Sequence, residues 1–281
     1  MDAWSVWLFE PSLPAAVVAT ILYSVATAWI TYLTCFKYRA WFFSCVPVGG
    51  LCQVTGYAMR SYSTQNHQNI VGSMSDPPRL SSFGSQIHGK IGIFASSTSL
   101  IVLAPIFIAA GNYLLIGRLI RAVLPPTHHK IFKIPARYLT RVYVSLDIVC
   151  MCVQSSGSSL ASGVGWTGEL ADIGINILLA GLALQVLSFS TYLCILVRFH
   201  VLSRSMAEPR APDGWHKVFR AVSISSSLIL VRCIFRMVEF AEGQEGYSLQ
   251  HEWMFWIFEG LLMIIALTVF CIWHPSRYLK P

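Results

Sequence analysis

The sequence predicts an all-α fold: a polytopic membrane protein built as a single bundle of seven transmembrane helices, with the N-terminus outside and the C-terminus in the cytoplasm. Of the 281 residues 55% are hydrophobic and only 12% are charged, whereas a soluble domain usually has a charged fraction of about 25%. Several apolar runs approach the length needed to cross a bilayer, and the Lys and Arg residues gather on alternate connections between those runs. Length, apolarity and charge distribution therefore predict the same architecture.

Seven apolar segments are close to the roughly 20 residues that span a hydrocarbon core. They cover residues 13–34, 41–58, 91–116, 142–160, 173–197, 221–240 and 253–273. The second is the shortest, and the run SSGSS interrupts the fourth. Residues 61–90 are rich in Ser, Gly, Asn, Gln and Pro, which predicts an irregular or mobile loop, with a short surface helix as the alternative for part of it. Residues 1–281 are expected to form one domain.

The positive charges indicate how this bundle is oriented. With the N-terminus outside, 15 of the 20 Lys and Arg residues fall on inner connections or on the C-terminal tail. Cytoplasmic loops are enriched in Lys and Arg, so this distribution fixes the predicted orientation. The same distribution explains the net charge of +7 without a nucleic-acid partner, because no basic stripe alternates with stacking aromatics. We expect an integral protein of the plasma membrane, with an internal membrane as the alternative.

Polar side chains inside the predicted spans recur at helical spacing. Arg232, Arg236 and Glu239 follow the spacing i, i+4, i+7 and share one helical stripe. On the next span Glu252, Trp256, Glu259 and Met263 follow the same rule. Because polar groups facing lipid are unfavourable, such stripes are expected to face the bundle interior. The candidate binding residues are Gln53, Tyr57, Arg60, Asp147, Gln154, Gln185, Arg232, Arg236, Glu239, Glu252, Trp256 and Glu259.

The predicted depths of these residues suggest a polar pocket that opens outward. Arg232 falls near the membrane centre, Arg236 and Glu239 fall in the outer half, and Asp147 falls toward the inner half. Two interpretations of the charges remain open. Buried Arg–Glu networks often serve only to fix helix register, but five intramembrane charges exceed what packing requires, which favours a ligand site.

Standard catalytic signatures are absent from the sequence. It contains neither a G-x-S-x-G elbow nor an H-E-x-x-H pair, and no metal site or cofactor is predicted. The expected partners are membrane lipids and an amphipathic small molecule. If the protein is an intramembrane enzyme, the buried carboxylates Asp147, Glu239 and Glu259 are the candidate acids or bases.

Several segments together resemble a known family, the fungal RTA-like or lipid-translocating exporters. They are Gly56-Tyr57 with Arg60, LAPIFIAAGNYLLIGR at 103–118, Asp147 with QSSG at 154–157, GLALQ at 181–185, R-x-x-x-R-x-x-E at 232–239, and Glu252 with WIFE at 256–259. The sequence departs from the family pattern at Gln53, where an acid is usual, and at 256–259, where Tyr-x-Phe-Asp is usual.

The resemblance implies a seven-helix protein with an outside N-terminus that moves or senses amphipathic molecules such as sphingoid bases, sterol-like amphiphiles or porphyrins. Translocation of such a molecule is the leading hypothesis, in which a cationic lipid amine pairs with Glu239, Glu259 or Glu252. The alternatives are an intramembrane acid–base enzyme acting on a lipid or isoprenoid, and a seven-helix receptor or sensor.

Overall fold

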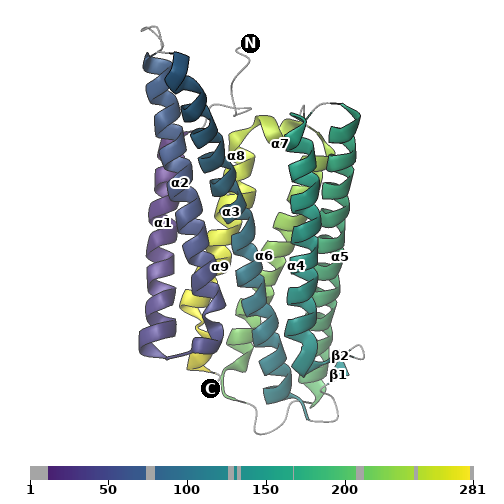
Figure 1. Ribbon diagram of the computed structural model, residues 1–281. Helices are drawn as coiled ribbons and strands as arrows, with labels where there is room; N and C mark the ends of the chain where they lie inside the picture. Colours follow the sequence, from purple (N-terminus) through teal and green to yellow (C-terminus); the bar gives the residue numbers. More distant parts are fainter. Residues whose placement is uncertain are drawn as a thin grey trace.

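The fold is a bundle of long helices that run side by side (Figure 1). The computed structural model describes residues 12–73, 80–125, 130–131, 134–166, 168–206, 212–243 and 246–278. The long helices are α1 (Leu13–Thr31), α2 (Cys45–Ser73), α3 (Leu80–Val123), α4 (Ala136–Gly163), α5 (Glu169–Met206), α6 (Trp215–Ala241) and α9 (Leu262–Ile272).

Shorter elements connect the long helices. A π-helical turn, η1 (Tyr32–Lys37), continues α1, and the 3-10 turn η2 (Trp41–Phe43) leads into α2. Strands β1 (Lys130–Ile131) and β2 (Ile134–Pro135) pair antiparallel before α4. The last span begins with α7 (Tyr247–Gln250) and α8 (Glu252–Phe255), passes through the π-helical segment η4 (Trp256–Leu261) into α9, and ends in η5 (Pro275–Arg277).

Six helical stretches in the described part of the chain are long and apolar enough to cross a membrane. They are Leu13–Lys37, Ser96–Val123, Ala136–Gly163, Glu169–Ser205, Trp215–Ala241 and Glu252–Arg277. The predicted all-α, polytopic membrane fold is thus confirmed. Helix α2 is the seventh long element of the bundle and packs between α1 and α3, although it does not reach the same apolarity (Figure 1).

The second and third helices are longer than the apolar segments that predicted them. The backbone is helical over 61–73 and again over 80–90, so the prediction of an irregular loop over 61–90 is wrong for most of that stretch. Ser, Asn and Gln lower helix propensity only slightly. The Pro77-Pro78 pair, a much stronger helix breaker, lies outside the described residues.

Helices α3 and α6 lie in the interior, and their neighbours present apolar side chains outward. On α1, Ala16, Ala19, Tyr23, Thr27 and Ile30 recur every three or four residues and are buried. The opposite face exposes large apolar side chains, as a lipid-facing surface requires. These include Val18, Ile21, Val25, Trp29 and Phe36.

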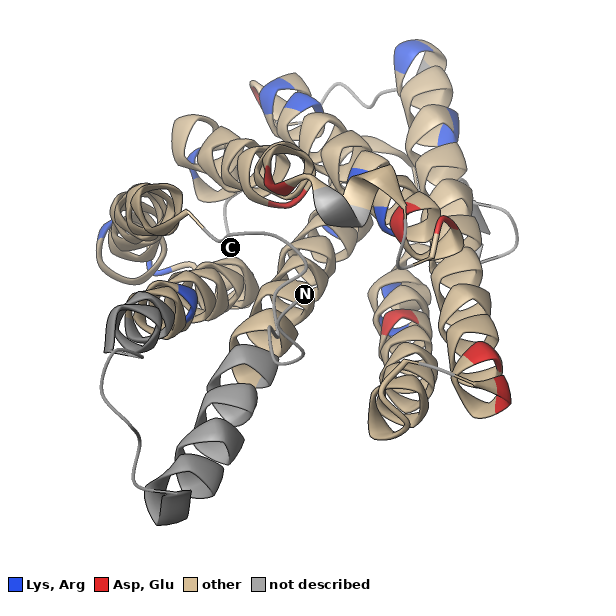
Figure 2. Ribbon diagram, turned by 90° about the horizontal axis from the view of Figure 1, so that it is seen from above, with Lys and Arg blue, Asp and Glu red and all other residues tan. Residues whose placement is uncertain are grey.

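Charge is distributed unequally between the two ends of the bundle. The connections α1–α2, α3–α4 and α5–α6 and the C-terminus lie at one end, which is the lower end in Figure 1. The described basic residues of this end are Lys37, Arg39, Arg118, Arg121, Lys130, Arg137, Arg141, Arg198, Arg204, Lys217, Arg220 and Arg277. Glu169, Asp172, Glu242 and Glu252 lie toward the other end, whereas Asp213 lies in the α5–α6 connection at the basic end; Figure 2 colours both kinds of charge. The assignment of the basic end to the cytoplasm stays a prediction from the positive-inside rule.

Candidate ligand-binding site

Four charged side chains from the last two spans form one buried cluster, here called the charge cluster: Arg232, Arg236 and Glu239 of α6 and Glu259 of η4. Arg232 Nε donates a hydrogen bond to Glu259 Oε2 at 2.8 Å, and its Nη2 lies 2.7 Å from the same oxygen. Arg236 pairs through Nε with the other Glu259 oxygen and donates from Nη1 to Glu239 Oε2 at 2.8 Å. Glu259 is fully buried. Two guanidinium groups therefore share two carboxylates, and the formal charges cancel.

The sequence positions these four groups through two local features. Helical spacing places the three α6 residues on one stripe, as predicted. Glu259 reaches them from a π-helical turn, a wider helical turn that often occurs at functional sites. Behind Glu259, the hydroxyl of Tyr23 on α1 donates to the carbonyl of Gly260 at 2.6 Å, so α1 holds this segment in place.

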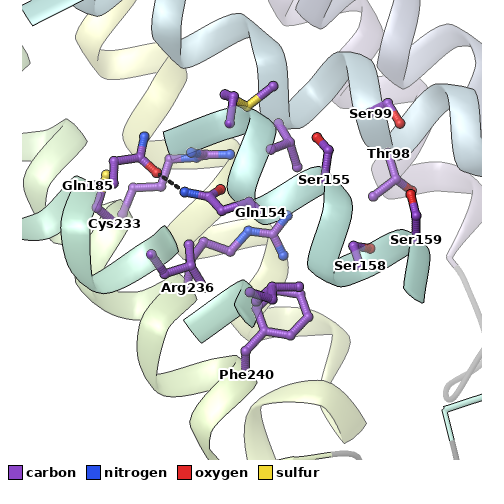
Figure 3. Close-up of a pocket in the computed structure, with 15 residues that line it drawn as sticks. Thr98, Ser99, Gln154, Ser155, Ser158, Ser159, Gln185, Cys233, Arg236 and Phe240 are labelled. Carbon is purple, nitrogen blue, oxygen red and sulfur yellow. Dashed lines mark hydrogen bonds between the residues drawn. The ribbon is translucent and has the colours of Figure 1, made fainter. Parts of the chain in front are cut away.

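A cavity of about 270 Å³ lies between α3, α4, α5 and α6, and the two Arg of the charge cluster form part of its wall (Figure 3). The lining residues are Thr98, Ser99, Val102, Met151, Gln154, Ser155, Ser158, Ser159, Leu178, Leu182, Gln185, Arg232, Cys233, Arg236 and Phe240. All these lining residues lie in the half of the bundle that contains the end of α4 and the start of α5, which is the upper half in Figure 1. If the predicted orientation holds, this half is the outer one.

The wall of the cavity combines polar and apolar groups. Gln154 Nε2 donates to Gln185 Oε1 at 2.8 Å across the α4–α5 interface, close to the Arg236 side chain (Figure 3). Ser and Thr hydroxyls of α3 and α4 form another part of the wall, and Val102, Leu178 and Leu182 supply apolar surface. No described Asp or Glu lines the cavity. An amphipathic molecule could satisfy both its polar and its apolar parts in such a space.

Asp147 lies one helical turn below the cavity wall, at i−4 from Met151 on α4. It is buried and accepts a hydrogen bond from the Tyr113 hydroxyl of α3 at 2.8 Å. Tyr192 packs edge-on against Tyr113, with ring centroids 4.6 Å apart, and encloses the pair. The predicted placement of Asp147 beneath the pocket agrees with this geometry, but its side chain does not line the cavity.

A second group of predicted residues gathers between α2 and the last span. Tyr57 stacks on Tyr23 at 5.1 Å and on Trp256 at 5.8 Å between ring centroids. The Arg60 guanidinium lies over the ring of Phe255 at 4.2 Å, a cation–π geometry. These side chains support the segment that holds Glu259, and none of them lines the cavity.

Glu252 and Gln53 lie apart from the charge cluster. Both carboxylate oxygens of Glu252 accept the backbone N–H of Ser12, at 3.0 and 3.1 Å, so Glu252 ties the start of α1 to the last span. Gln53 is fully buried on α2, and neither polar atom of its side chain has a hydrogen-bond partner among the described residues.

Several lining residues were not predicted as site residues. Thr98, Ser99, Ser155 and Ser159 supply hydroxyls to the wall. The runs SSTS at 96–99 and SSGSS at 155–159 were the available signal, because hydroxyl side chains clustered in a membrane span must find polar partners or a polar cavity. Tyr113, the partner of Asp147, lies in an apolar run, and no cluster of polar residues around it marked it as a site residue.

No group of His, Cys, Asp and Glu suited to hold a metal ion occurs among the described side chains.

The helical bundle and its internal charge cluster define a polytopic membrane protein with a cavity of mixed polar and apolar wall. A family model described as RTA1 like protein matches residues 79–281, which is well over half of the chain. The chain therefore belongs to the RTA1-like family, as its sequence motifs indicated. No solved structure matches it.

Three relatives from Saccharomyces cerevisiae are informative. Protein RTM1 is 27% identical over 241 residues, covering 83% of this chain and 68% of RTM1. Protoporphyrin uptake protein 1 is 31% identical over 175 residues, covering 62% of this chain and 55% of that protein. Sphingoid long-chain base transporter RSB1 (strain Lalvin EC1118 / Prise de mousse) is 24% identical over 275 residues, covering 85% of this chain and 65% of RSB1. The chain thus spans less than two thirds of the length of the latter two.

Proposed function

We propose that this protein binds an amphipathic, lipid-like molecule in the cavity between α3, α4, α5 and α6 and translocates it across the membrane. The observation that carries this proposal is the composition of the cavity wall: guanidinium, amide and hydroxyl groups stand beside Val102, Leu178 and Leu182 around one cavity. A molecule with a polar head and an apolar body fits such a wall better than a purely polar solute does.

The relatives support the same class of ligand. One is named for sphingoid long-chain bases and another for protoporphyrin uptake, and both molecules combine a polar group with a large apolar body. A sphingoid base, a sterol-like amphiphile and a porphyrin are the candidate ligands for this chain. The plasma membrane is the proposed location.

The arrangement of α3 and α4 supports entry from the bilayer. The lower ends of these helices lie together and their upper parts diverge (Figure 1). The cavity lies in the upper half, and Ser155 and Ser159, both exposed, form its rim on α4. A lipid that enters sideways keeps its tail in an apolar environment while its head reaches the polar wall.

The carboxylates first expected to bind a cationic amine already have partners. Glu259 is held by two Arg, Glu239 by Arg236, and Glu252 by the Ser12 backbone. In the proposed site the ligand head therefore meets the Arg, Gln and hydroxyl groups of the cavity wall. The same placement favours binding over intramembrane catalysis, because neither Asp147 nor Glu239 nor Glu259 is among the lining residues.

The proposal is tested with the purified protein in two steps. Native mass spectrometry identifies any lipid that stays bound, and reconstituted vesicles then report whether the protein moves a fluorescent analogue of that lipid between leaflets. Ser158→Trp, which fills the cavity, is expected to abolish both signals. Ser156→Trp is the matched control, because Ser156 lies on the same helix but is exposed and outside the cavity.

Equal loss or equal retention in the two Ser variants would contradict the cavity as the binding site. Accumulation of a chemically altered lipid would instead favour the enzyme hypothesis. Ligand-dependent binding of a cytoplasmic partner without lipid movement would favour the receptor hypothesis.

A further inference from the structure

We infer that the cavity selects amphiphiles whose head group is an anionic oxygen group, a carboxylate or a phosphate, over amphiphiles with an amine head. This inference rests on the proposed function and narrows it to a class of ligand. The observation behind it is the orientation of the charge cluster: its two Arg line the cavity, and its two Glu do not.

The hydrogen bonds explain this orientation. Glu259 is fully buried and engages Arg232 through Nε and Nη2 and Arg236 through Nε. Glu239 engages Nη1 of Arg236. Both carboxylates are thus engaged within the charge cluster and neither lines the cavity, whereas both guanidinium groups do. A guanidinium group has five N–H donors in a fixed fork, so each Arg retains N–H groups that no carboxylate of the cluster uses.

The other polar groups of the wall fit the same head. The amide nitrogens of Gln154 and Gln185 and the hydroxyl of Ser158 can donate hydrogen bonds. Carboxylate and phosphate oxygens only accept them, and charge-assisted bonds from Arg to these anions are among the stronger hydrogen bonds in proteins. Since the charge cluster is formally neutral, selectivity comes from these donors facing the cavity rather than from net charge.

An ammonium head meets the opposite situation. It only donates hydrogen bonds, and no Asp or Glu in the described wall accepts them. Amide and hydroxyl oxygens remain as acceptors for an amine, and they bind it more weakly than a carboxylate would.

A series of ligands with one tail and different heads tests this inference. Oleate, oleyl phosphate, oleylamine and oleyl alcohol share an 18-carbon chain, and their dissociation constants for the full-length protein in uncharged detergent are compared by native mass spectrometry. Oleate or oleyl phosphate is expected to bind at least about tenfold more tightly than oleylamine, and the difference between those two anions identifies the preferred head.

A charge placed in the cavity provides a second test that leaves the charge cluster intact. Gln154→Glu replaces an amide in the wall with a carboxylate of the same shape. Gln185, which accepts from Gln154 in the wild type, can donate to this carboxylate once its amide turns over. This variant is expected to bind oleate and oleyl phosphate more weakly than the wild type does, and to bind oleylamine more tightly. The control, Ser156→Glu, adds the same charge to α4 outside the cavity and is expected to bind like the wild type.

The outcomes separate the inference from the function on which it rests. Tighter binding of oleylamine, or equal binding of all four heads, overturns the inference while binding of an amphiphile stands. Absence of binding for every head overturns both. An unchanged preference for anionic heads in Gln154→Glu also overturns the inference, because the head group would then not bind next to residue 154 in this cavity.

Discussion

Tyr113 of α3 and Asp147 of α4 form a hydrogen-bonded pair in the interior of the bundle, with 2.8 Å between the hydroxyl and carboxylate oxygens. The other oxygen of Asp147 has no hydrogen-bond partner among the described residues, and no described Lys or Arg forms a salt bridge with this carboxylate. The pair lies just below the cavity and joins two of the helices that form its wall.

Removing the Tyr113 hydroxyl tests how much this pair stabilises the bundle. Tyr113→Phe leaves Asp147 buried without its donor and is expected to lower the free energy of unfolding by about 1–3 kcal/mol. Asp147→Asn keeps an acceptor for Tyr113 and is expected to change stability less. Unfolding in detergent measures both, with the exposed Tyr138→Phe as control. Wild-type stability of Tyr113→Phe would contradict the assigned role.

Within the charge cluster, Glu259 is expected to matter more than Glu239. Glu259→Gln leaves Arg232 without its carboxylate partner and Arg236 with one, and breaking a buried pair costs about 3–5 kcal/mol. Glu239→Gln leaves Arg236 paired with Glu259, so a smaller loss follows. Thermal unfolding of the two variants in one detergent checks this order, and the reverse order would contradict the geometry of the cluster.

Close packing of α4 on α5 depends on glycine at one position. A Cβ on Gly157 would lie 2.6 Å from both the Gly174 carbonyl oxygen and the Leu178 nitrogen. Gly157→Ala must therefore separate the helices, with an expected loss of about 1–3 kcal/mol and a distorted Gln154–Gln185 bond. Gly163→Ala on the same helix is the control, because a Cβ there meets nothing within 4 Å. Equal melting temperatures for the two variants would refute this explanation.

The bond from Tyr23 to the Gly260 carbonyl is expected to position Glu259. Tyr23→Phe keeps the stacking on Tyr57 and removes only the bond, which contributes about 1 kcal/mol. Both the free energy of unfolding and the affinity for the preferred C18 ligand should fall. Tyr32→Phe, at an exposed position on the same span, should change neither. A lower free energy of unfolding without any effect on binding would limit Tyr23 to a structural role.

The sequence predicted the parts of the molecule that follow regular helical spacing. Arg232, Arg236 and Glu239 share a stripe because α6 is a regular helix. The pairing of the two Arg with Glu259 follows from the high cost of unpaired charges in a membrane. Arg60 and Trp256 also lie near each other, although on a supporting layer rather than on the cavity wall.

Features that depend on long-range contacts were not predictable in this way. Glu252 accepts a hydrogen bond from Ser12, 240 positions earlier in the chain, and no local pattern indicates such a contact. The Ser and Thr residues that supply the hydroxyls of the cavity wall are not distinguishable from other Ser and Thr residues in the sequence, because they form a wall only when α3 and α4 pack beside each other. The loop expected over 61–90 was inferred from polarity, but helix formation depends on backbone geometry and tolerates polar side chains.

The π-helical segment Trp256–Leu261 has a further consequence for the last span. A π turn holds one more residue than an α turn, and one residue corresponds to a rotation of about 100° around an α-helix axis. The helical positions before and after this turn are therefore out of phase, and the single stripe predicted for Glu252, Trp256, Glu259 and Met263 is broken. Glu252 binds the Ser12 backbone while Glu259 meets the Arg pair. Shortening this segment by one residue would convert it to an ordinary α turn and swing every side chain of α9 away from its present neighbours without altering its composition.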